Sequence, residues 1–284
     1  MSGRTYSVIV PTRDRHAVLS LCLDRLAPGS QELAQARYEV IVTDDSPTES
    51  ARELVTTRYP WARWMAGPRR GPAANRNRAA AATTAEYLVF VDDDCVPERE
   101  LLSGYDGVER DGIDVYEGRI TCKDGIASPR QTAPLNLEGG ALWSCNFAIR
   151  RSAFKAVGGF DERFPIAHME DVDLRERLRT AGFHVQFVPG ASVDHPPRRL
   201  PWGASLAQQH RAGMLYMVLH PPVRGLAWYL QNTLRARLSR VRRLPKSFDS
   251  LLELGSVLVE LTAIAWNWSR WKRWARSLAA GGRP

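Results

Sequence analysis

Short apolar runs and helix-like stretches alternate along the first third of the chain. The runs at 6–10, 38–44, 61–66 and 86–91 are rich in strand-forming residues, and stretches of helical character separate them at 16–26, 49–58 and 73–82. The order strand, helix, strand indicates an α/β fold with parallel strands. Because the runs are continuously apolar, helices should cover both faces of the sheet. We therefore predict a three-layer α/β/α sandwich with a mainly parallel central sheet.

The chain changes character after residue 200. Helices are predicted at 203–219, 224–244 and 247–278, with breaks at Pro221-Pro222 and Pro245. Residues 201–284 hold 13 Arg and Lys against 3 Asp and Glu, a net +10, which leaves −2 (8 − 10) for residues 1–200. Six of the nine tryptophans also lie there. We predict one domain at 1–200 and a basic, Trp-rich helical region at 201–284.

The totals exclude several protein classes. With 284 residues, 44% hydrophobic and 25% charged, the composition is globular rather than disordered or fibrous. Four widely spaced cysteines are too few for a disulfide scaffold, so we expect reduced thiols. The N-terminus lacks the basic start and apolar stretch of a signal peptide, which favours a cytoplasmic location.

Acidic residues recur at the carboxyl ends of the predicted strands, where α/β sheets bind ligands. In an extended segment, Asp92 and Asp94 would share one side, with Asp93 opposite. Carboxylates this close raise one another's pKa unless a divalent cation compensates them. Oxygen ligands favour Mg²⁺ or Mn²⁺, which typically also binds phosphate oxygens. The alternative is a solvated turn, where aspartate is common.

Six segments occur in an order that resembles the GT-A glycosyltransferases of family 2. They are VIVPTRDR, IVTDDS, GPAANRNRAA, FVDDDCVP, NFAIRRSAFKAVGGFDERF and MEDVDLRERLRTAGF, within residues 6–195. Each motif alone is weak, but the ordered set is specific. The resemblance implies a GT-A catalytic domain with its nucleotide-sugar part at about 1–97 and its acceptor side at about 98–200. It further implies inverting transfer of a sugar from a nucleotide-diphosphate donor to an acceptor hydroxyl of a glycan, a lipid-linked molecule or a small molecule.

Position by position, the resemblance also implies roles for individual residues. The donor nucleotide would be bound by Pro11, Thr12, Asp14, Asp44, Asp45, Arg76, Asp92 and Asp93. A Mn²⁺ or Mg²⁺ ion would be held by Asp94, Asp92 and His195. Asp171 would act as the general base, with Glu170 beside it. The chemistry needs both groups, because a cation offsets charge on the leaving phosphate and a carboxylate must accept the acceptor's proton.

Other interpretations of these residues stay open. Glu170 and Asp171 can simply begin a helix at 172–181, where carboxylates favour the positive N-terminal end. His195 precedes two prolines and can bond the backbone only. Arg76 can lie on the exposed face of its helix. The glycines at 158 and 159 can form a turn that requires positive φ.

The C-terminal region and the whole chain also have alternatives. Arg-rich helices with tryptophan can lie on the inner face of the cell membrane, or they can pack as a helical subdomain. The basic charge also fits a protein that binds nucleic acid or another polyanion. A sugar-1-phosphate nucleotidyltransferase would use a metal on a related sheet, but VIVPTRDR lacks its glycine-rich loop. A binding module without activity is the remaining alternative.

Overall fold

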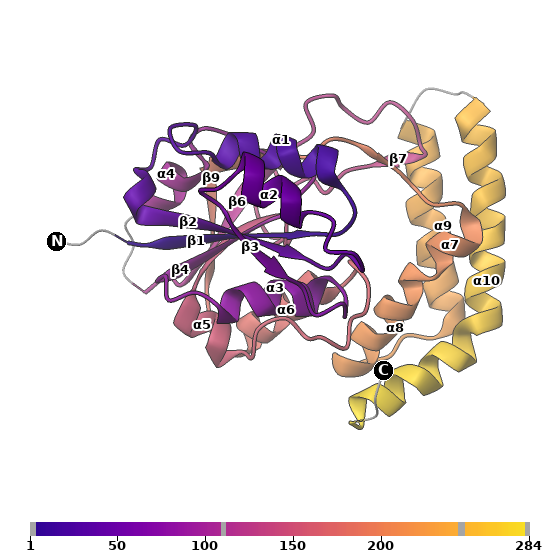
Figure 1. The fold of residues 1–284 in the computed structure, drawn as a ribbon. Coiled ribbons are helices and arrows are strands. Elements are labelled where there is room, and N and C mark those ends of the chain that lie inside the picture. The colour runs from indigo at the N-terminus through magenta and orange to yellow at the C-terminus, as the bar shows by residue number, and fades with distance from the viewer. Residues whose placement is uncertain (1–3, 109–111, 244–247, 282–284) are drawn as a thin grey trace. The chain divides into compact units, whose positions relative to one another are not determined.

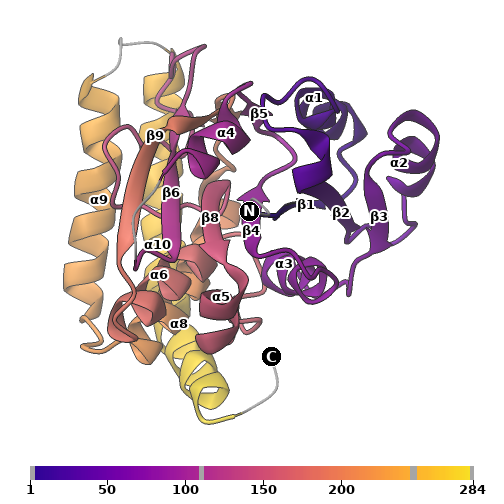
Figure 2. The same cartoon turned by 90° about the vertical axis from the view of Figure 1, so that its left-hand side faces the viewer.

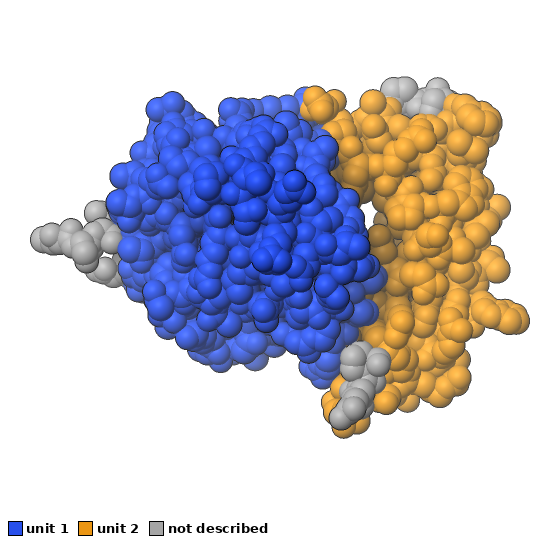
Figure 3. Space-filling model, viewed as in Figure 1, with its two compact units in different colours: residues 1–123, 134–196 blue, residues 124–133, 197–284 orange. Residues whose placement is uncertain are grey.

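The protein was analysed as a computed structural model, which describes residues 4–108, 112–243 and 248–281 (Figure 1). The chain divides into two compact units, shown in different colours in Figure 3. Unit 1 contains residues 1–123 and 134–196, and unit 2 contains residues 124–133 and 197–284. Residues 124–133 and 197–200 thus group with the C-terminal helices. The predicted boundary at residue 200 stays a prediction about domain organisation.

An eight-stranded sheet forms the centre of the described part of unit 1, in the order β3-β2-β1-β4-β8-β6-β9-β5. Neighbours among β3, β2, β1 and β4 are parallel, as are β6 and β9, whereas β8 and β5 run antiparallel to their neighbours. The mainly parallel sheet is therefore confirmed. The strands are β1 (Tyr6–Thr12), β2 (Tyr38–Asp44), β3 (Arg63–Ala66), β4 (Tyr87–Val91), β5 (Val96–Pro97), β6 (Val115–Thr121), β8 (Asn146–Arg150) and β9 (Val185–Asp194).

Helices cover both faces of this sheet, as Figures 1 and 2 show. Side chains alternate across each strand, so Val8 and Val10 join the core beneath α1, α2 and α4, while Ile9 joins the core beneath α3, α5 and α6. Both cores are built from fully buried aliphatic and aromatic residues. The helices are α1 (His16–Leu26), α2 (Arg52–Arg58), α3 (Pro72–Ala81), α4 (Leu101–Asp106), α5 (Arg151–Ala156) and α6 (Glu170–Thr180).

Strand register brings distant polar residues to one edge of the sheet. In the parallel β1–β2 pair, Thr12 lies opposite Asp44, and β1 pairs with β4 up to Ile9 opposite Phe90. The short antiparallel β5–β9 pair places Val96 opposite Asp194. The segments that leave β1, β2, β4 and β9 therefore converge, which is where α/β sheets bind ligands.

Unit 2 consists of helices and a small two-stranded sheet. The strands are β7 (Gln131–Thr132) and β10 (Arg198–Arg199), and the helices are α7 (Gly203–Ala207), α8 (Gln209–Leu219), α9 (Leu226–Arg243) and α10 (Phe248–Ala279). The single helix predicted at 203–219 is interrupted, because Gln208 bonds the carbonyl of Ser205 in a tighter turn. The break predicted at Pro245 lies outside the described residues. Within the described residues, no helix has the length and apolar character needed to cross a membrane.

Candidate active site

The aspartate triplet lies in a tight turn directly after β4. A backbone hydrogen bond of 3.1 Å from the Cys95 N–H to the Asp92 carbonyl closes this turn. Asp92 therefore contacts Arg76, whereas Asp93 and Asp94 turn toward a shared Arg15. The prediction that Asp92 and Asp94 lie on the same side is wrong, because it assumed an extended segment.

Asp93 lies beneath the turn and is fully buried. Its carboxylate accepts a hydrogen bond of 2.7 Å from the Thr12 hydroxyl and pairs with the Arg15 guanidinium. Burial raises the pKa of Asp93 to about 7, although Arg15 and Thr12 both oppose the shift. Near neutral pH, this carboxyl group therefore changes its protonation state. Arg15 also contacts Asp94 at 2.7 Å, so one cation serves two members of the triplet.

Asp94, in the turn after β4, and His195, just after β9, face each other. The Asp94 Oδ1 atom lies 3.4 Å from His195 Nε2. Nδ1 lies 2.9 Å from the Pro196 carbonyl, which can only accept, so Nδ1 carries a proton and Nε2 points toward Asp94. Burial opposes ionisation of Asp94, but the imidazole and Arg15 outweigh it and lower its pKa. Burial likewise opposes protonation of His195, but Asp94 outweighs it and raises the pKa of the imidazole.

This pair of side chains fits a divalent cation. Asp94 Oδ1 is buried and lacks a hydrogen-bond partner of good geometry, which leaves its lone pairs available. An imidazole whose Nδ1 donates to a backbone carbonyl is oriented as metal-binding histidines usually are. One ligand atom each from Asp94, Cys95 and His195 lie within 4.8 Å of one another. Burial raises the pKa of the Cys95 thiol well above its usual value, so the sulfur stays neutral and is a poor ligand.

Arg76 joins the aspartate triplet to the acidic pair at residues 170 and 171. It lies in α3 and is only 2% exposed, so the alternative of an exposed helix face is wrong. One nitrogen contacts Asp92 at 2.5 Å and another contacts Glu170 at 3.1 Å, with the guanidinium over the Phe160 ring. Burial alone would lower the pKa of Arg76, but these two carboxylates outweigh it and raise the pKa.

The residues on either side of Arg76 fix its position. Asn75 donates a hydrogen bond of 2.9 Å to the Thr43 carbonyl at the end of β2. Asn77 donates to the Phe160 carbonyl at 2.8 Å and accepts from the Phe160 N–H at 2.9 Å, which holds the loop after α5. The adjacent glycines at 158 and 159 both have positive φ, as the predicted turn requires. Three successive side chains of α3 therefore bind three different segments of the site.

The acidic pair Glu170 and Asp171 begins α6. Met169 precedes it in the left-handed conformation at φ 74°. Burial and the neighbouring Asp171 raise the pKa of Glu170 to about 8 against the opposing effect of Arg76. Burial also raises the pKa of Asp171, but its oxygens accept hydrogen bonds from Val172 N–H at 2.8 Å and Ser144 N–H at 3.3 Å, which favour the ionised form. Burial thus raises the pKa of both carboxyl groups, and backbone hydrogen bonds oppose this shift at Asp171.

The two aspartates after β2 organise the loops on the other side of the triplet. Asp44 is fully buried and accepts from the backbone N–H groups of Ser46 at 3.0 Å and Ala51 at 2.8 Å. Asp45 accepts from two N–H groups of the loop 67–71, at 2.5 and 3.0 Å. Asp44 thus holds its own loop, whereas Asp45, which is also buried, joins two loops at this edge.

Residues 11–14, at the end of β1 and just after it, border the Asp44–Asp45 loop. Pro11 and Thr12 are buried at the end of the strand, and Asp14 is exposed with φ 54°. The Asp14 N–H donates to the Ser46 hydroxyl at 2.9 Å, and its carboxylate accepts from Ser50 at 3.1 Å. The structure therefore brings the segment 11–14 next to the Asp44–Asp45 loop, and Thr12 links both to the aspartate triplet.

Comparison with known proteins identifies the fold and its lineage. The model of the family described as "Glycosyl transferase family 2" matches residues 7–125, and the model described as "N-terminal domain of galactosyltransferase" matches residues 130–197. The glycosyltransferase AglE of Haloferax volcanii is 26% identical over 222 residues, which cover 73% of this chain and 71% of AglE. The chain is a glycosyltransferase that matches family 2 over residues 7–125. The predicted family and the predicted enzyme class are thus confirmed. The matches thus favour a glycosyltransferase over the two other predicted classes, a nucleotidyltransferase and a nucleic-acid-binding protein.

Solved structures agree with the GT-A fold of this family-2 glycosyltransferase. Staphylococcus aureus TarS 1-349 in complex with UDP-GlcNAc has a TM-score of 0.58 at 15% identity, covering 98% of this chain and 92% of that one. The mannosyltransferase PcManGT from Pyrobaculum calidifontis in complex with GDP-Man and Mn²⁺ has a TM-score of 0.53 at 18% identity, covering 100% and 77%. Other curated relatives are longer, and the chain spans 63% of one and 49% of another.

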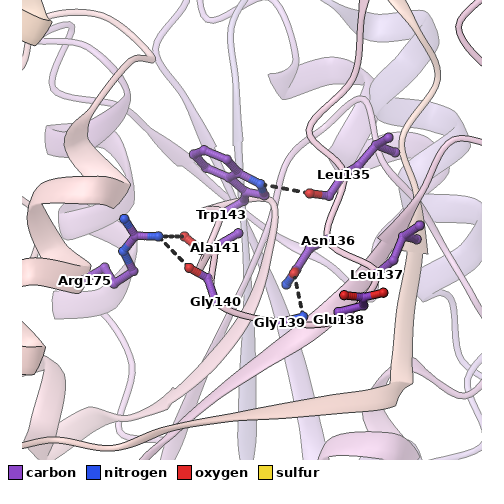
Figure 4. A pocket seen from close by; sticks show the side chains of 9 residues that line it. All are labelled: Leu135, Asn136, Leu137, Glu138, Gly139, Gly140, Ala141, Trp143 and Arg175. Carbon is purple, nitrogen blue, oxygen red and sulfur yellow. Dashed lines mark hydrogen bonds between the residues drawn. The ribbon is translucent and has the colours of Figure 1, made fainter.

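Two parts of the glycosyltransferase site were not predicted from the sequence. The first is Arg15, whose pairing with the triplet has no signal beyond its place after β1. The second is a pocket of about 460 Å³ lined by residues 135–141, Trp143 and Arg175 (Figure 4). The Trp143 indole donates to the Leu135 carbonyl at 3.3 Å, and Arg175 donates to two carbonyls of the loop at 2.6 and 3.2 Å. Arg175 lies one helical turn after Asp171, so the pocket adjoins the acidic pair.

A buried carboxylate keeps this loop in place. Glu117 of β6 accepts hydrogen bonds from the backbone N–H groups of residues 140, 141 and 142, at 2.5, 3.0 and 2.9 Å. Gly139 and Gly140 have φ values of 91° and 92°, which side chains rarely adopt, and so allow the tight path around the carboxylate. The loop next to Asp171 is therefore ordered by the sheet itself.

We expect metal affinity in this glycosyltransferase to rise with pH through the neutral range. If His195 is a ligand, as the sequence predicts, a cation would need its neutral imidazole, and the raised pKa of His195 means that a proton competes for it up to a higher pH than usual. Each displaced proton contributes up to about tenfold in affinity per pH unit below its pKa. Calorimetric titration with Mn²⁺ from pH 5.5 to 8.5 measures the slope. In His195→Asn, the slope should fall and the affinity should drop.

The exposed His184, just after α6, provides the matched control. His184→Asn should reproduce the wild-type profile. A remaining slope in His195→Asn is expected from Asp93, because burial raises its pKa to about 7. An unchanged affinity and slope in His195→Asn would show that this imidazole does not bind the metal.

Proposed function

We propose that the protein is an inverting glycosyltransferase that moves a sugar from a nucleoside-diphosphate donor to an acceptor hydroxyl, with Asp171 as the general base. One observation carries the proposal. The buried Arg76 contacts both Asp92 and Glu170, and so holds the aspartate triplet at the donor side within one network with the acidic pair. A displacement reaction needs these two groups on opposite sides of one reacting carbon.

The donor's diphosphate would bind at the aspartate triplet with Mn²⁺ or Mg²⁺. We propose Asp94 and His195 as the metal ligands, since their free atoms face each other. Asp92 was also expected as a ligand, but its carboxylate pairs with Arg76, so we assign it to positioning. When bound, the cation would offset the negative charge that develops on the leaving diphosphate. PcManGT, which shares the fold, binds GDP-Man with Mn²⁺.

The nucleoside would lie along the segment 11–14 and the Asp44–Asp45 loop. These segments border the triplet through the Thr12 hydrogen bond to Asp93. Asp45 would contact the base, as the resemblance implies, while Asp44 supports the loop through its backbone hydrogen bonds. Arg15 is placed to contact phosphate oxygens, because its half-exposed guanidinium already lies against Asp93 and Asp94.

The acceptor would approach from the side of Asp171 and the loop 135–143. The backbone N–H of Ser144 and that of Val172 hold the Asp171 carboxylate in one orientation. Glu170 is occupied by its contact with Arg76, so Asp171 is the member of the pair that is available to accept a proton. The acceptor hydroxyl would lose its proton to Asp171 as its oxygen bonds to the anomeric carbon, while the bond from that carbon to the donor's phosphate oxygen breaks and the nucleoside diphosphate leaves.

A thermal-shift screen tests this function. We expect a UDP-, dTDP- or GDP-sugar together with Mn²⁺ to raise the melting temperature by about 5 °C or more at 100 times its Kd. The same nucleotide sugar without metal should give a much smaller shift, because the diphosphate then meets uncompensated carboxylates. The proposal fails if every nucleotide sugar gives the same small shift with and without Mn²⁺.

A further inference from the structure

One face of α10 exposes large apolar side chains to solvent. Leu251 is 67% exposed, Leu258 68% and Trp266 87%. Phe248 and Trp266 are 18 positions apart, about five turns at 3.6 residues per turn, so they lie on the same side of the helix. Single exposed apolar residues are ordinary, but a continuous row indicates a surface that binds something. We call this row the α10 face: Phe248, Leu251, Leu254, Leu258, Val259 and Trp266.

Buried ion pairs fix which side of α10 faces outward. Glu253 lies 3.4 Å from Arg130, and Glu260 contacts Arg237 at 3.0 Å and His210 at 2.7 Å, all within unit 2. Both glutamates are at most 1% exposed. Rotating the helix to bury the α10 face would break the ion pairs of Glu253 and Glu260. The exposed row is thus a consequence of the packing on the opposite side.

The same side of the helix becomes cationic beyond Trp266. Leu258 and Arg276 are also 18 positions apart, about five turns, and therefore share a direction. Arg270, Arg273 and Arg276 are all exposed. The outward side of α10 thus has an apolar first half and a basic second half, with the most exposed tryptophan at the boundary. Tryptophan between apolar and charged segments is typical of a helix at a membrane interface.

The charge of unit 2 indicates the kind of partner. Residues 124–133 and 197–284 contain 16 Arg and Lys and 4 Asp and Glu, a net +12, which leaves −4 (8 − 12) for unit 1. A second copy of unit 2 would bring +12 against +12 at this face, which opposes association. An anionic lipid surface offers an apolar interior for the row and negative headgroups for the arginines.

We propose that the α10 face docks on an anionic lipid bilayer, with its apolar row in the outer acyl region and Arg270, Arg273 and Arg276 among the headgroups. The helix lies on the surface and does not cross it, because Glu253 and Glu260 occupy its other side. This docking is independent of the proposed sugar transfer. It stands or falls on the surface of unit 2 alone.

Vesicle flotation of the full chain tests the proposal. We expect binding to phosphatidylcholine vesicles that contain about 30% phosphatidylglycerol, and weaker binding to phosphatidylcholine alone. Leu251→Ser with Leu258→Ser should weaken binding to the anionic vesicles by about tenfold or more, since two side chains lose their burial in lipid. Leu21→Ser is the control, because Leu21 is 56% exposed on α1. It should bind as the wild type does.

The arginines are tested on the same vesicles. Arg273→Gln with Arg276→Gln should weaken binding to anionic vesicles and make it less sensitive to salt. Arg52→Gln with Arg99→Gln, two exposed arginines of unit 1, should leave binding unchanged. Unaltered melting temperatures in all four variants would show that folding is intact, because each replaced side chain is exposed.

Three results would overturn the proposal. The first is an absence of binding to either kind of vesicle at low salt. The second is binding that the serine variant retains in full, which would show attraction by charge alone. The third is a wild-type dimer in light scattering that the serine variant converts to a monomer, which would make a second copy the partner. Mn²⁺-dependent nucleotide-sugar binding should be unchanged in the serine variant, so the two proposals fail separately.

Discussion

Replacing Asp171 with asparagine is expected to lower kcat for sugar transfer by about 10²- to 10⁴-fold. Asparagine has nearly the same shape, and its carbonyl oxygen can still accept a hydrogen bond from Ser144 or Val172. It cannot take a proton from the acceptor hydroxyl. Donor affinity in the presence of Mn²⁺, measured by calorimetry, should change by less than about threefold, because the change removes proton transfer rather than donor contacts.

Glu176→Gln is the matched control for Asp171→Asn. Glu176 lies in the same helix and pairs with Arg179. It should retain wild-type kcat. If Asp171→Asn keeps more than about a tenth of the wild-type turnover, another group serves as the base. If donor binding is lost together with turnover, Asp171 acts in binding.

Asp94→Asn is expected to weaken Mn²⁺ binding by at least about 10²-fold, and to remove the effect of Mn²⁺ on donor affinity. Asp94 supplies a buried oxygen without a good hydrogen-bond partner, facing the His195 Nε2 atom. An amide oxygen lacks the negative charge that holds a divalent cation. The measurement is calorimetric titration with Mn²⁺, followed by nucleotide-sugar titration with and without the metal.

The neighbouring Asp93 gives a control within the same turn. Its carboxyl is buried against Thr12 and has a pKa near 7, so a protonated and neutral side chain is already compatible with the fold. Asp93→Asn should therefore reduce Mn²⁺ affinity much less than Asp94→Asn does. Equal losses in the two variants would mean that total charge governs metal binding, and would remove the special role of Asp94.

The sheet and its helices were predictable because their signals are local. The helix predicted at 16–26 and the strand predicted at 38–44 have the bounds of α1 and β2 in the structure. Each depends on a run of side chains that are apolar in sequence and buried in the fold. The stop after α6 was also local, since Gly182 adopts φ 82° just beyond the last turn.

The geometry of the site was less predictable because it depends on contacts between distant segments. The spacing of Asp92, Asp93 and Asp94 suggested an extended segment, but a turn redirects their carboxylates. That turn is followed by β5, which pairs with β9 and so brings His195 to Asp94. Arg15 contacts the triplet because β1 and β4 are adjacent strands. None of these pairings leaves a pattern in the sequence of one segment.

In the C-terminal region, too, the helices were predictable from the local sequence, whereas their contacts with distant segments were not. Their presence followed from helical composition and from the prolines that break the chain. The burial of Glu253 and Glu260 was not predictable, because it requires Arg130 from an earlier segment and Arg237 from α9. Consequently, the outward direction of the apolar row on α10 emerged only from the structure.

The central claim is that Asp94 and His195 hold the cation that binds the donor's diphosphate. The most direct test is a crystal grown with Mn²⁺ and a nucleoside diphosphate, with diffraction recorded at the manganese absorption edge. We expect an anomalous peak about 2.0–2.3 Å from an Asp94 oxygen and from His195 Nε2, with diphosphate oxygens beside it. A peak elsewhere, with Asp94 and His195 still facing each other and no ion between them, would contradict the claim.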